Sequence, residues 1–426
     1  MKKFKRAVSR KTVFLSVLAG SLLIGIIFYR VFEPIATDNT TVNFSKIAVA
    51  QAGAFITKIH DPYAVITKTA ILEPVVSSGT PKDFKSEIAK DPYLSKHFEI
   101  IAYDNAEIVK SGYGFDYQPY YEKKLEILRR KYDIDNVIAP AVNEYGQILL
   151  VSNWLNSRIS FGVPHNVSYN FDALDILSRA EHGEKFFCSE YVTTYIQALS
   201  SIGITSRFVG LLKGHVVAEV WSNDYDKWVV IDPTFDIFYE LNGVPLNALE
   251  LHNAWVEKSW QRIKIVLNSK NSQINNYPYS LIDYYENFFV RMRNDWFTNR
   301  YPRWHPKSNS IMNSIEWSDK YTKDNILVSN EAKRIEDLYW PLNHVHISLL
   351  GCQLSADKVI MKLRFNTVTP NFDRFEIKLD KAKAVYYNYN STFEWELSKG
   401  ANTFSAASVN RFGLKGRASI ISINYK

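Results

Sequence analysis

The alternation of apolar and polar positions is most regular between residues 170 and 235, where it predicts two helices followed by three strands. The first helix is expected to begin near Asn170, a residue type that caps helices, and the second to begin near Cys188 and end at Gly203. Apolar residues three or four positions apart would form the buried face of each helix. These residues are Phe171, Leu174 and Leu177 in the first helix, and Val192, Tyr195, Ile196 and Leu199 in the second.

The three predicted strands are Ser206–Leu211, His215–Trp221 and Lys227–Asp232. In the second strand every other residue from Val216 to Val220 is apolar, so one face of this strand should be buried. Helices followed by neighbouring strands are typical of an α+β domain.

The rest of the chain has a weaker pattern. Tyr121–Tyr132 and Gln147–Ser157 each match an amphipathic helix, and residues 250–340 are expected to be largely helical. Residues 340–426 alternate in short runs separated by turn-forming residues, which suggests a small β-sandwich.

Residues 1–30 have the composition of a membrane anchor. Six basic residues lie in residues 1–11, and residues 12–29 carry no charge. A helix of that length just spans a bilayer, and basic residues tend to remain on the cytoplasmic side. We therefore expect a single-pass membrane protein with its N-terminus in the cytoplasm and its body outside the cytoplasm. A cleaved signal peptide is the alternative, but no small-x-small cleavage site follows the stretch directly.

These patterns together predict six segments. They are a basic head (1–11), a transmembrane anchor (12–29), an accessory region (31–140), a core domain (141–255), a mainly helical aromatic-rich segment (256–339) and a β-rich C-terminal domain (340–426).

Charge is balanced over the body of the chain, although the formal net charge is +7. Six of the 51 basic residues lie before residue 12, whereas all 44 acidic residues lie after it. The body therefore lacks the basic surface that a nucleic-acid backbone requires, and no nucleic-acid partner is expected.

Cys188 has the setting of a thiol nucleophile. A helix N-terminus favours a thiolate, and such a nucleophile also needs a base and a group that orients the base. The only other cysteine is Cys352, so a disulfide scaffold is ruled out, although the count alone allows one bridge between the two.

The hairpin after the predicted helix offers a base and an orienting group. If Asn223 and Asp224 form a two-residue turn, His215 lies directly opposite Asp232 on one face of the sheet. The same register places Glu219 opposite Trp228. A carboxylate would then hold an imidazole, as an orienting group should.

Each of these residues also has an ordinary structural role. A cysteine at a helix start is commonly a small buried apolar residue, and an aspartate before proline is commonly a turn former. A histidine at the start of a strand is usually a satisfied surface or core residue. The order of Cys188, His215 and Asp232 and their predicted convergence favour a shared site over three unrelated roles.

Phe187–Phe235 resembles the transglutaminase-like superfamily, whose core is a papain-like thiol site. The resemblance covers residues 150–255, with Asn153-Trp154 as a weaker upstream match. It implies that Cys188 is the nucleophile, His215 the general base and acid, and Asp232 the orienting carboxylate. The matching segments are Cys188–Tyr191, Gly203–Val209, His215–Trp221 and Trp228–Thr234.

One departure from the family pattern lies at the thiol itself. Phe186 and Phe187 stand where family members often carry a glycine before the cysteine, which would narrow access to the sulfur. The backbone N–H of Cys188 would be one donor of an oxyanion hole.

With this resemblance, the predicted fold class is α+β. It comprises a papain-like or transglutaminase-like core with a helix packed on an antiparallel sheet, an N-terminal transmembrane helix and a C-terminal β-sandwich-like domain.

The resemblance also implies an extracytoplasmic thiol enzyme that acts on amide or peptide bonds through a thioester, with hydrolysis favoured over amine transfer. Its expected partners are a protein or peptide substrate and, through residues 12–29, the membrane.

The alternative is a catalytically silent envelope protein that holds a protein or glycan. The aromatic residues between Tyr284 and Trp304 would then form a docking surface, unless they pack a helical core. The arginines among them, Arg291, Arg293 and Arg300, are expected on a solvated face.

No cofactor is expected. The sequence contains no glycine-rich phosphate loop. His344 and His346 share one face of a predicted strand, but no carboxylate or cysteine at ligand spacing accompanies them, so a metal site is not predicted.

Overall fold

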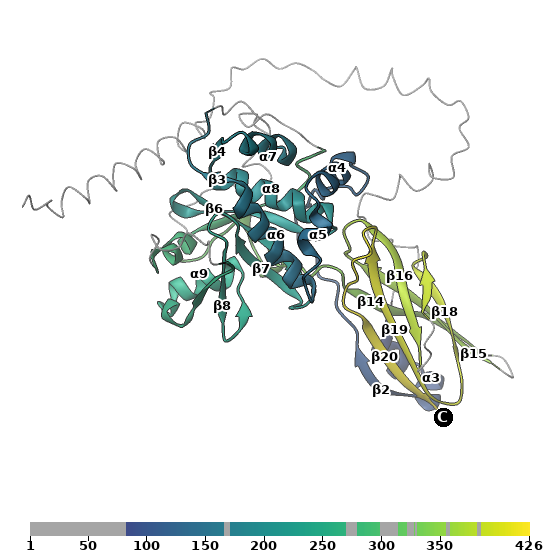
Figure 1. Cartoon of the computed structure of the whole chain (residues 1–426). Helices are drawn as coiled ribbons and strands as arrows, with labels where there is room; N and C mark the ends of the chain where they lie inside the picture. The colour runs from purple at the N-terminus through teal and green to yellow at the C-terminus, as the bar shows by residue number, and fades with distance from the viewer. Residues whose placement is uncertain are drawn as a thin grey trace, which may run out of the picture. The chain divides into compact units, whose positions relative to one another are not determined.

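The protein is described by a computed structural model, and all its described residues belong to one compact unit, Leu72–Lys426. They form a mixed α/β structure in which helices cover a large sheet and two further sheets share a separate core (Figure 1). The described residues are 82–165, 171–269, 279–298, 314–321, 328, 330–354, 358–380 and 385–426.

Helix α8 (Cys188–Ser201) is the central helix of the first core, and every one of its residues except Ser189 is buried. The side chains of Tyr191 and Tyr195 donate hydrogen bonds from α8 to backbone carbonyls directly after the end of α6 and in its second turn. The helices around α8 are α4 (Lys123–Lys131), α5 (Ile134–Ile138), α6 (Glu144–Arg158) and α7 (Ala173–Glu181).

The start of α7 differs slightly from the prediction. Its N-cap is Asp172, whose side chain accepts a hydrogen bond from the Leu174 N–H at 3.0 Å. Asn170, the predicted cap, lies outside the described residues.

The main sheet is built around four antiparallel strands that follow one another along the chain. These are β5 (Ser206–Leu211), β6 (His215–Ser222), β7 (Lys227–Asp232) and β8 (Ile237–Leu241). The first three were predicted from the alternation of side chains. Later strands extend both edges: β11 (Phe288–Arg291), β12 (Ser314–Trp317) and β13 (Glu331–Ala332) beyond β5, and β9 (Val244–Pro245) and β10 (Lys264–Leu267) beside β8.

The two faces of this sheet bury different cores. Val216, Ala218 and Val220 of β6 pack in the cluster that contains the helices around α8. Val217 and Trp221, which point to the other face, pack with α9 (Ala248–Val256) and residues of the 3-10 helix η6 (Tyr279–Glu286). Both faces of β6 are therefore covered, as its almost continuous apolar sequence requires.

A buried ion pair lies within the second core. Arg207 and Glu219 are opposite one another on β5 and β6, both are fully buried, and their closest charged atoms are 2.6 Å apart. The Arg207 guanidinium also lies 4.0 Å from the centre of the Trp228 ring. Glu219 accepts further bonds from the Tyr339 hydroxyl at 2.9 Å and the Ala248 N–H at 2.8 Å, which compensate the cost of burying its charge.

The C-terminal sheets form a sandwich around a third core (Figure 1). One sheet contains β1 (Lys82–Asp83), β14 (Val345–Leu354), β15 (Val359–Thr367) and β18 (Thr392–Leu397). The other contains β17 (Tyr386–Asn388), β16 (Phe372–Leu379), β19 (Gly400–Asn410), β20 (Ser419–Tyr425) and β2 (Phe98–Asp104).

Two strands of the sandwich come from the region expected to be a separate accessory segment. β1 pairs with β14, and β2 pairs with β20. Helices α2 (Phe84–Lys90) and α3 (Pro92–His97) connect β1 to β2. Residues 82–104 therefore complete the C-terminal sheets.

The segment between residues 256 and 339 differs from the predicted helices. Its described residues form strands and short 3-10 helices, including η4 (Trp260–Arg262) and η8 (Ile335–Asp337). Tyr285, Phe288 and Trp296 are buried because they pack in the two cores beside the main sheet.

The sequence predicted that three arginines of this segment lie on a solvated face. This prediction is wrong for two of them. Arg291 and Arg293 are only 7% and 5% exposed, and both guanidinium groups contact the Trp296 ring. Arg300 and Trp304 lie outside the described residues.

The predicted fold class included an N-terminal transmembrane helix, and the structure gives no support for this helix. Across the part of the chain that the structure describes, no helix has both the length and the apolar character needed to cross a bilayer. Residues 12–29, on which the transmembrane helix was predicted, lie outside that part. The structure therefore gives a mixed α/β fold without support for the anchor.

Candidate active site

Cys188 is the first residue of α8, where the chain leaves a short two-stranded ribbon. In that ribbon β3 (Ser160–Phe161) runs parallel to β4 (Lys185–Phe186). The Cys188 side chain lies at the helix N-terminus, and the residue is 9% exposed. The backbone N–H groups of a first helical turn are oriented outward, so an anion at this sulfur would be stabilised.

The two aromatic residues before Cys188 have different environments. Phe186 is fully buried in the helical core, and the Arg179 guanidinium lies 5.8 Å from the centre of its ring. Phe187 is partly exposed, and its backbone N–H donates to the Glu190 carboxylate at 3.1 Å. Of the two aromatic residues, Phe186 therefore belongs to the core, and Phe187 is the one that reaches the surface.

His215 begins β6, directly after a tight 3-10 turn, η3 (Leu212–Gly214). Lys213 in that turn has a φ of 68°, in the left-handed region, which redirects the chain into the strand. The His215 side chain is 11% exposed. Its ring lies 5.3 Å from the Phe235 ring and 6.0 Å, edge to face, from the Tyr284 ring.

The His215 ring contacts both of the other predicted site residues. Its Nε2 lies 2.7 Å from Oδ2 of Asp232, and the Cys188 side chain is close enough to raise the pKa of the ring. A carboxylate can only accept, so Nε2 carries a proton, which leaves Nδ1 as the nitrogen available to a thiol. The structure thus brings together Cys188, His215 and Asp232, which come from three separate elements.

Asp232 ends β7 and is buried, at 1% exposure. Its Oδ1 accepts hydrogen bonds from the backbone N–H groups of Thr234 at 3.0 Å and Phe235 at 3.3 Å. Oδ2 is thereby directed to His215. Each carboxylate oxygen has at least one donor, as a buried charge requires.

The electrostatics of this arrangement favour a charged imidazole. Burial opposes the charge on His215, but the adjacent Asp232 carboxylate and the Cys188 side chain outweigh it and raise the pKa of His215 from 6.5 to about 10. The ring is then an imidazolium at neutral pH. A cation beside a thiol favours the nucleophilic thiolate.

The predicted register of the hairpin is wrong by two residues, although the predicted contact is present. The turn contains four residues, so Ser222 pairs with Lys227 and Glu219 pairs with Val230 instead of Trp228. A shift of two residues keeps every side chain on the same face of a sheet. His215 therefore reaches Asp232 diagonally, whereas a shift of one residue would have separated them.

Comparison with known proteins gives the same domain. Residues 134–233 match the family model of the transglutaminase-like superfamily. This transglutaminase-like domain contains Cys188, His215 and Asp232 and covers less than a quarter of the chain. No curated protein and no solved structure matches the chain.

Two residues near the imidazole were not singled out as site residues by the sequence. Phe235 follows Asp232 by three positions, and Tyr284 comes from η6, beyond the transglutaminase-like domain. Proximity to Asp232 could have indicated Phe235. Tyr284 had been grouped with a possible docking surface, because nothing in the sequence indicates that η6 approaches His215.

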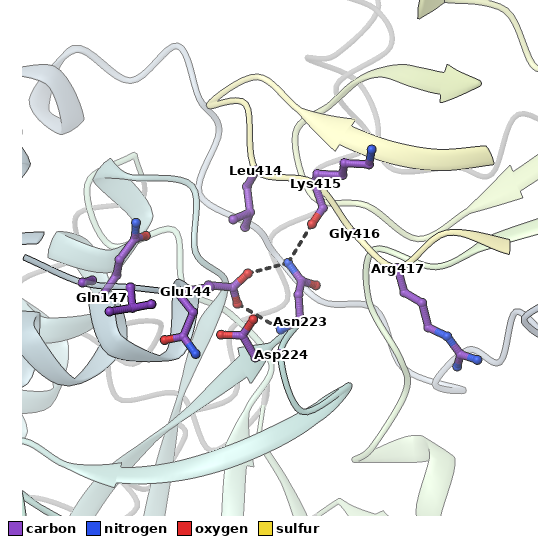
Figure 2. Close-up of a pocket in the computed structure, with 11 residues that line it drawn as sticks. Glu144, Gln147, Asn223, Asp224, Leu414, Lys415, Gly416 and Arg417 are labelled. Carbon is purple, nitrogen blue, oxygen red and sulfur yellow. Dashed lines mark hydrogen bonds between the residues drawn. The ribbon is translucent and has the colours of Figure 1, made fainter. Parts of the chain in front are cut away.

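The opposite end of the same hairpin is held by a different set of polar residues (Figure 2). Asn223 donates from its backbone N–H and its side chain to the Glu144 carboxylate, at 3.0 and 2.7 Å. Its side chain also donates to the Lys415 carbonyl at 3.3 Å. Burial and the nearby Asp224 raise the pKa of Glu144 to about 7, although the bonds from Asn223 oppose the rise.

A cavity of about 480 Å³ lies at this end of the hairpin, lined by Glu144, Asn223, Asp224 and Lys415 among others (Figure 2). None of the three residues of the candidate active site lines it. The cavity is therefore separate from the thiol.

The other candidates from the sequence have structural partners. Cys188 and Cys352 form no disulfide. The His344 ring bonds to the Asp226 carboxylate, and the His346 ring contacts the Ala106 carbonyl at 2.8 Å. Among the described ranges, no group of three or more potential metal-binding side chains is found.

Proposed function

We propose that the protein is a cysteine-dependent enzyme that cleaves amide or peptide bonds through Cys188, His215 and Asp232. The observation that carries this proposal is the position of the His215 ring, which lies 2.7 Å from the Asp232 carboxylate and also interacts with the Cys188 side chain. A nucleophile, a base and an orienting acid in contact are the arrangement that nucleophilic catalysis requires.

In the first step, the Cys188 sulfur attacks the carbonyl carbon of the substrate after its proton has passed to Nδ1 of His215. The negative charge that develops on the carbonyl oxygen would be stabilised by the Cys188 backbone N–H at the start of α8. His215 then protonates the departing amine, the C–N bond breaks, and a thioester remains on Cys188.

In the second step, water attacks the thioester while His215 takes its proton, which releases a carboxylic acid and restores the thiol. A second amine in place of water would give acyl transfer. We favour hydrolysis because the resemblance is to bacterial transglutaminase-like proteins, which are often peptidase-like, and because water needs no acceptor site.

The proposed substrate is a protein or peptide amide located outside the cytoplasm. This location rests on the basic and uncharged stretches of the first thirty residues, which lie outside the described part of the structure. Protease accessibility of the chain in intact cells tests it, and protection of the entire body would contradict it.

The nucleophile can be tested by comparing the two cysteines of the chain. Burial and the nearby Asp91 raise the pKa of Cys352, so this thiol should be slow to react near neutral pH. We expect iodoacetamide to label a Cys352→Ser variant, which keeps Cys188, much faster than a Cys188→Ala variant, which keeps Cys352. Equal labelling rates would overturn the assignment of the nucleophile.

Turnover is tested with a peptide library and a fluorescent primary amine. Hydrolysis in ¹⁸O-labelled water would place one heavy oxygen in each new carboxyl group, whereas transfer would attach the amine. Exclusive attachment of the amine would show that transfer, and not hydrolysis, is the favoured reaction. Failure of the Cys352→Ser variant to act on any peptide, while Cys188 is labelled rapidly, would favour a binding role.

A further inference from the structure

A second carboxylate, Asp236, ties the turn that carries Asp232 to helix α6. Asp236 is fully buried, four residues after Asp232. Its Oδ1 accepts hydrogen bonds from the Ser152 hydroxyl at 2.8 Å and the Asn268 side chain at 2.7 Å. Its Oδ2 accepts one from the Asn153 side chain at 3.0 Å. Two of these three donors lie on α6, so the carboxylate joins the turn to that helix.

The next turn of α6 holds the middle of the same segment. The Asn156 side chain donates to the carbonyls of Thr234 at 2.9 Å and Pro233 at 3.3 Å. The N–H of Thr234 in turn donates to Asp232. The short turn between β7 and β8 is therefore fixed to α6 both at its middle and at its end.

The backbone of the turn depends on these bonds. Asp236 has a φ of 53°, in the left-handed region, which costs free energy for a residue other than glycine. Such a conformation persists when the surrounding contacts fix it. Here the contacts are the three donors to its carboxylate and the N–H of Asn268, which donates to the Asp236 carbonyl at 3.0 Å.

Helix α6 also holds the element that carries the thiol. The Tyr195 hydroxyl of α8 donates to the Ile148 carbonyl at 2.9 Å, and the Tyr191 hydroxyl donates to the Ile159 carbonyl. One helix thus fixes both the start of α8, where Cys188 lies, and the turn that presents Asp232.

We propose that Asp236 is a positioning residue that, through α6, holds the Asp232 carboxylate against His215 and in line with Cys188. This inference rests on the proposed function, because it assigns Asp236 a role in the same site. The hydrogen bonds of Asp236 described above involve none of the reacting atoms. Loss of its bonds would let the turn relax, and the attraction between Asp232 and His215 would weaken as their 2.7 Å separation grows.

The test is an Asp236→Asn variant of the full chain. An asparagine has the same shape, but its NH₂ group replaces one carboxylate oxygen and cannot accept a hydrogen bond. At least one of the bonds from the three donor side chains must therefore be lost. We expect the pKa of His215, followed by NMR of protein with ¹⁵N-labelled histidine, to fall by about one pH unit. Ser152→Ala removes one donor with little change in volume and should shift this pKa in the same direction by a smaller amount.

A matched control separates positioning from general stability. Asp337 is also a buried carboxylate, at 3% exposure, and it accepts bonds from the backbone N–H groups of Gly112, Lys333 and Arg334. Asp337→Asn should lower the melting temperature, but it should leave the pKa of His215 unchanged.

The possible outcomes distinguish this proposal from the proposed function. If Asp232→Asn lowers the pKa of His215 but Asp236→Asn and Ser152→Ala do not, the positioning role is overturned and the catalytic site stands. If Asp232→Asn itself leaves this pKa unchanged, the proposed catalytic site fails. A shift of equal size in Asp337→Asn would show that only general stability is measured, and would also overturn the positioning role.

Discussion

Replacement of Asp232 by asparagine should remove most of the charge from His215. Two unit charges 2.7 Å apart attract by about 6 kcal/mol at an effective dielectric of ~20, which corresponds to about 4.5 pH units of pKa. Burial of the ring opposes its charge, which is consistent with a net rise in the pKa of His215 from 6.5 to about 10. Without Asp232, burial should dominate and lower this pKa below its ordinary value.

The assay is the rate of alkylation of Cys188 by iodoacetamide at pH 6.5, followed by intact mass. A Cys352→Ser background leaves Cys188 as the only cysteine of the chain. Since the neutral ring no longer stabilises a thiolate, Asp232→Asn should slow the reaction at least about tenfold, which is equivalent to about 1.4 kcal/mol. Equal rates with and without Asp232, in two folded proteins, would refute the inference that this carboxylate charges the imidazole.

Three further predictions concern stability. Glu219→Ala leaves Arg207 buried without its carboxylate partner and should cost about 3–5 kcal/mol in urea unfolding, whereas a loss below about 1 kcal/mol would mean that water reaches the guanidinium. Because the pKa of Glu144 is raised from 4.5 to about 7, this carboxyl should make the fold less stable as the pH rises through that range. Glu144→Gln should therefore become relatively more stable by about 3 kcal/mol between pH 4.5 and 8, and a difference in melting temperature that stays constant with pH would contradict this. In Gly416→Ala the new Cβ would lie 1.9 Å from the Asn343 carbonyl oxygen, so the melting temperature should fall clearly, and an unchanged value would show that the backbone there moves freely.

The elements that the sequence predicted well are those with local signals. Helix α8 and strands β5, β6 and β7 have regular apolar spacing, and each was found within about two residues of its predicted boundaries. The contact between His215 and Asp232 was also expected, although from a register that was two residues out. The contact is present despite this shift because side chains two residues apart on a strand point to the same face of the sheet.

The failures come from contacts between distant parts of the chain. β1 and β2 are short segments near residues 82–104 whose partners β14 and β20 lie more than 240 residues later, and no local pattern reveals such a pairing. In the same way β11 lies within the main sheet because it pairs with β5 on one side and β12 on the other, although its aromatic sequence had suggested a helix.

The burial of Arg291 and Arg293 has a similar cause. A guanidinium group can be buried beside aromatic rings and acidic groups, and here Trp296 lies beside both arginines and Asp295 pairs with Arg293. Arg293 and Asp295 are two residues apart in the sequence, but only the folded loop shows that they meet.

The extension of the main sheet has a practical consequence for anyone who clones the transglutaminase-like domain alone. A fragment limited to residues 134–233 would lack β8, which pairs with β7, and β11, which pairs with β5. Both outer strands of the fragment would then present bare hydrogen-bonding groups beside an uncovered apolar face, conditions that promote self-association. Expression trials should instead retain residues up to at least the end of β13 at Ala332, since a shorter fragment is expected to be recovered in inclusion bodies.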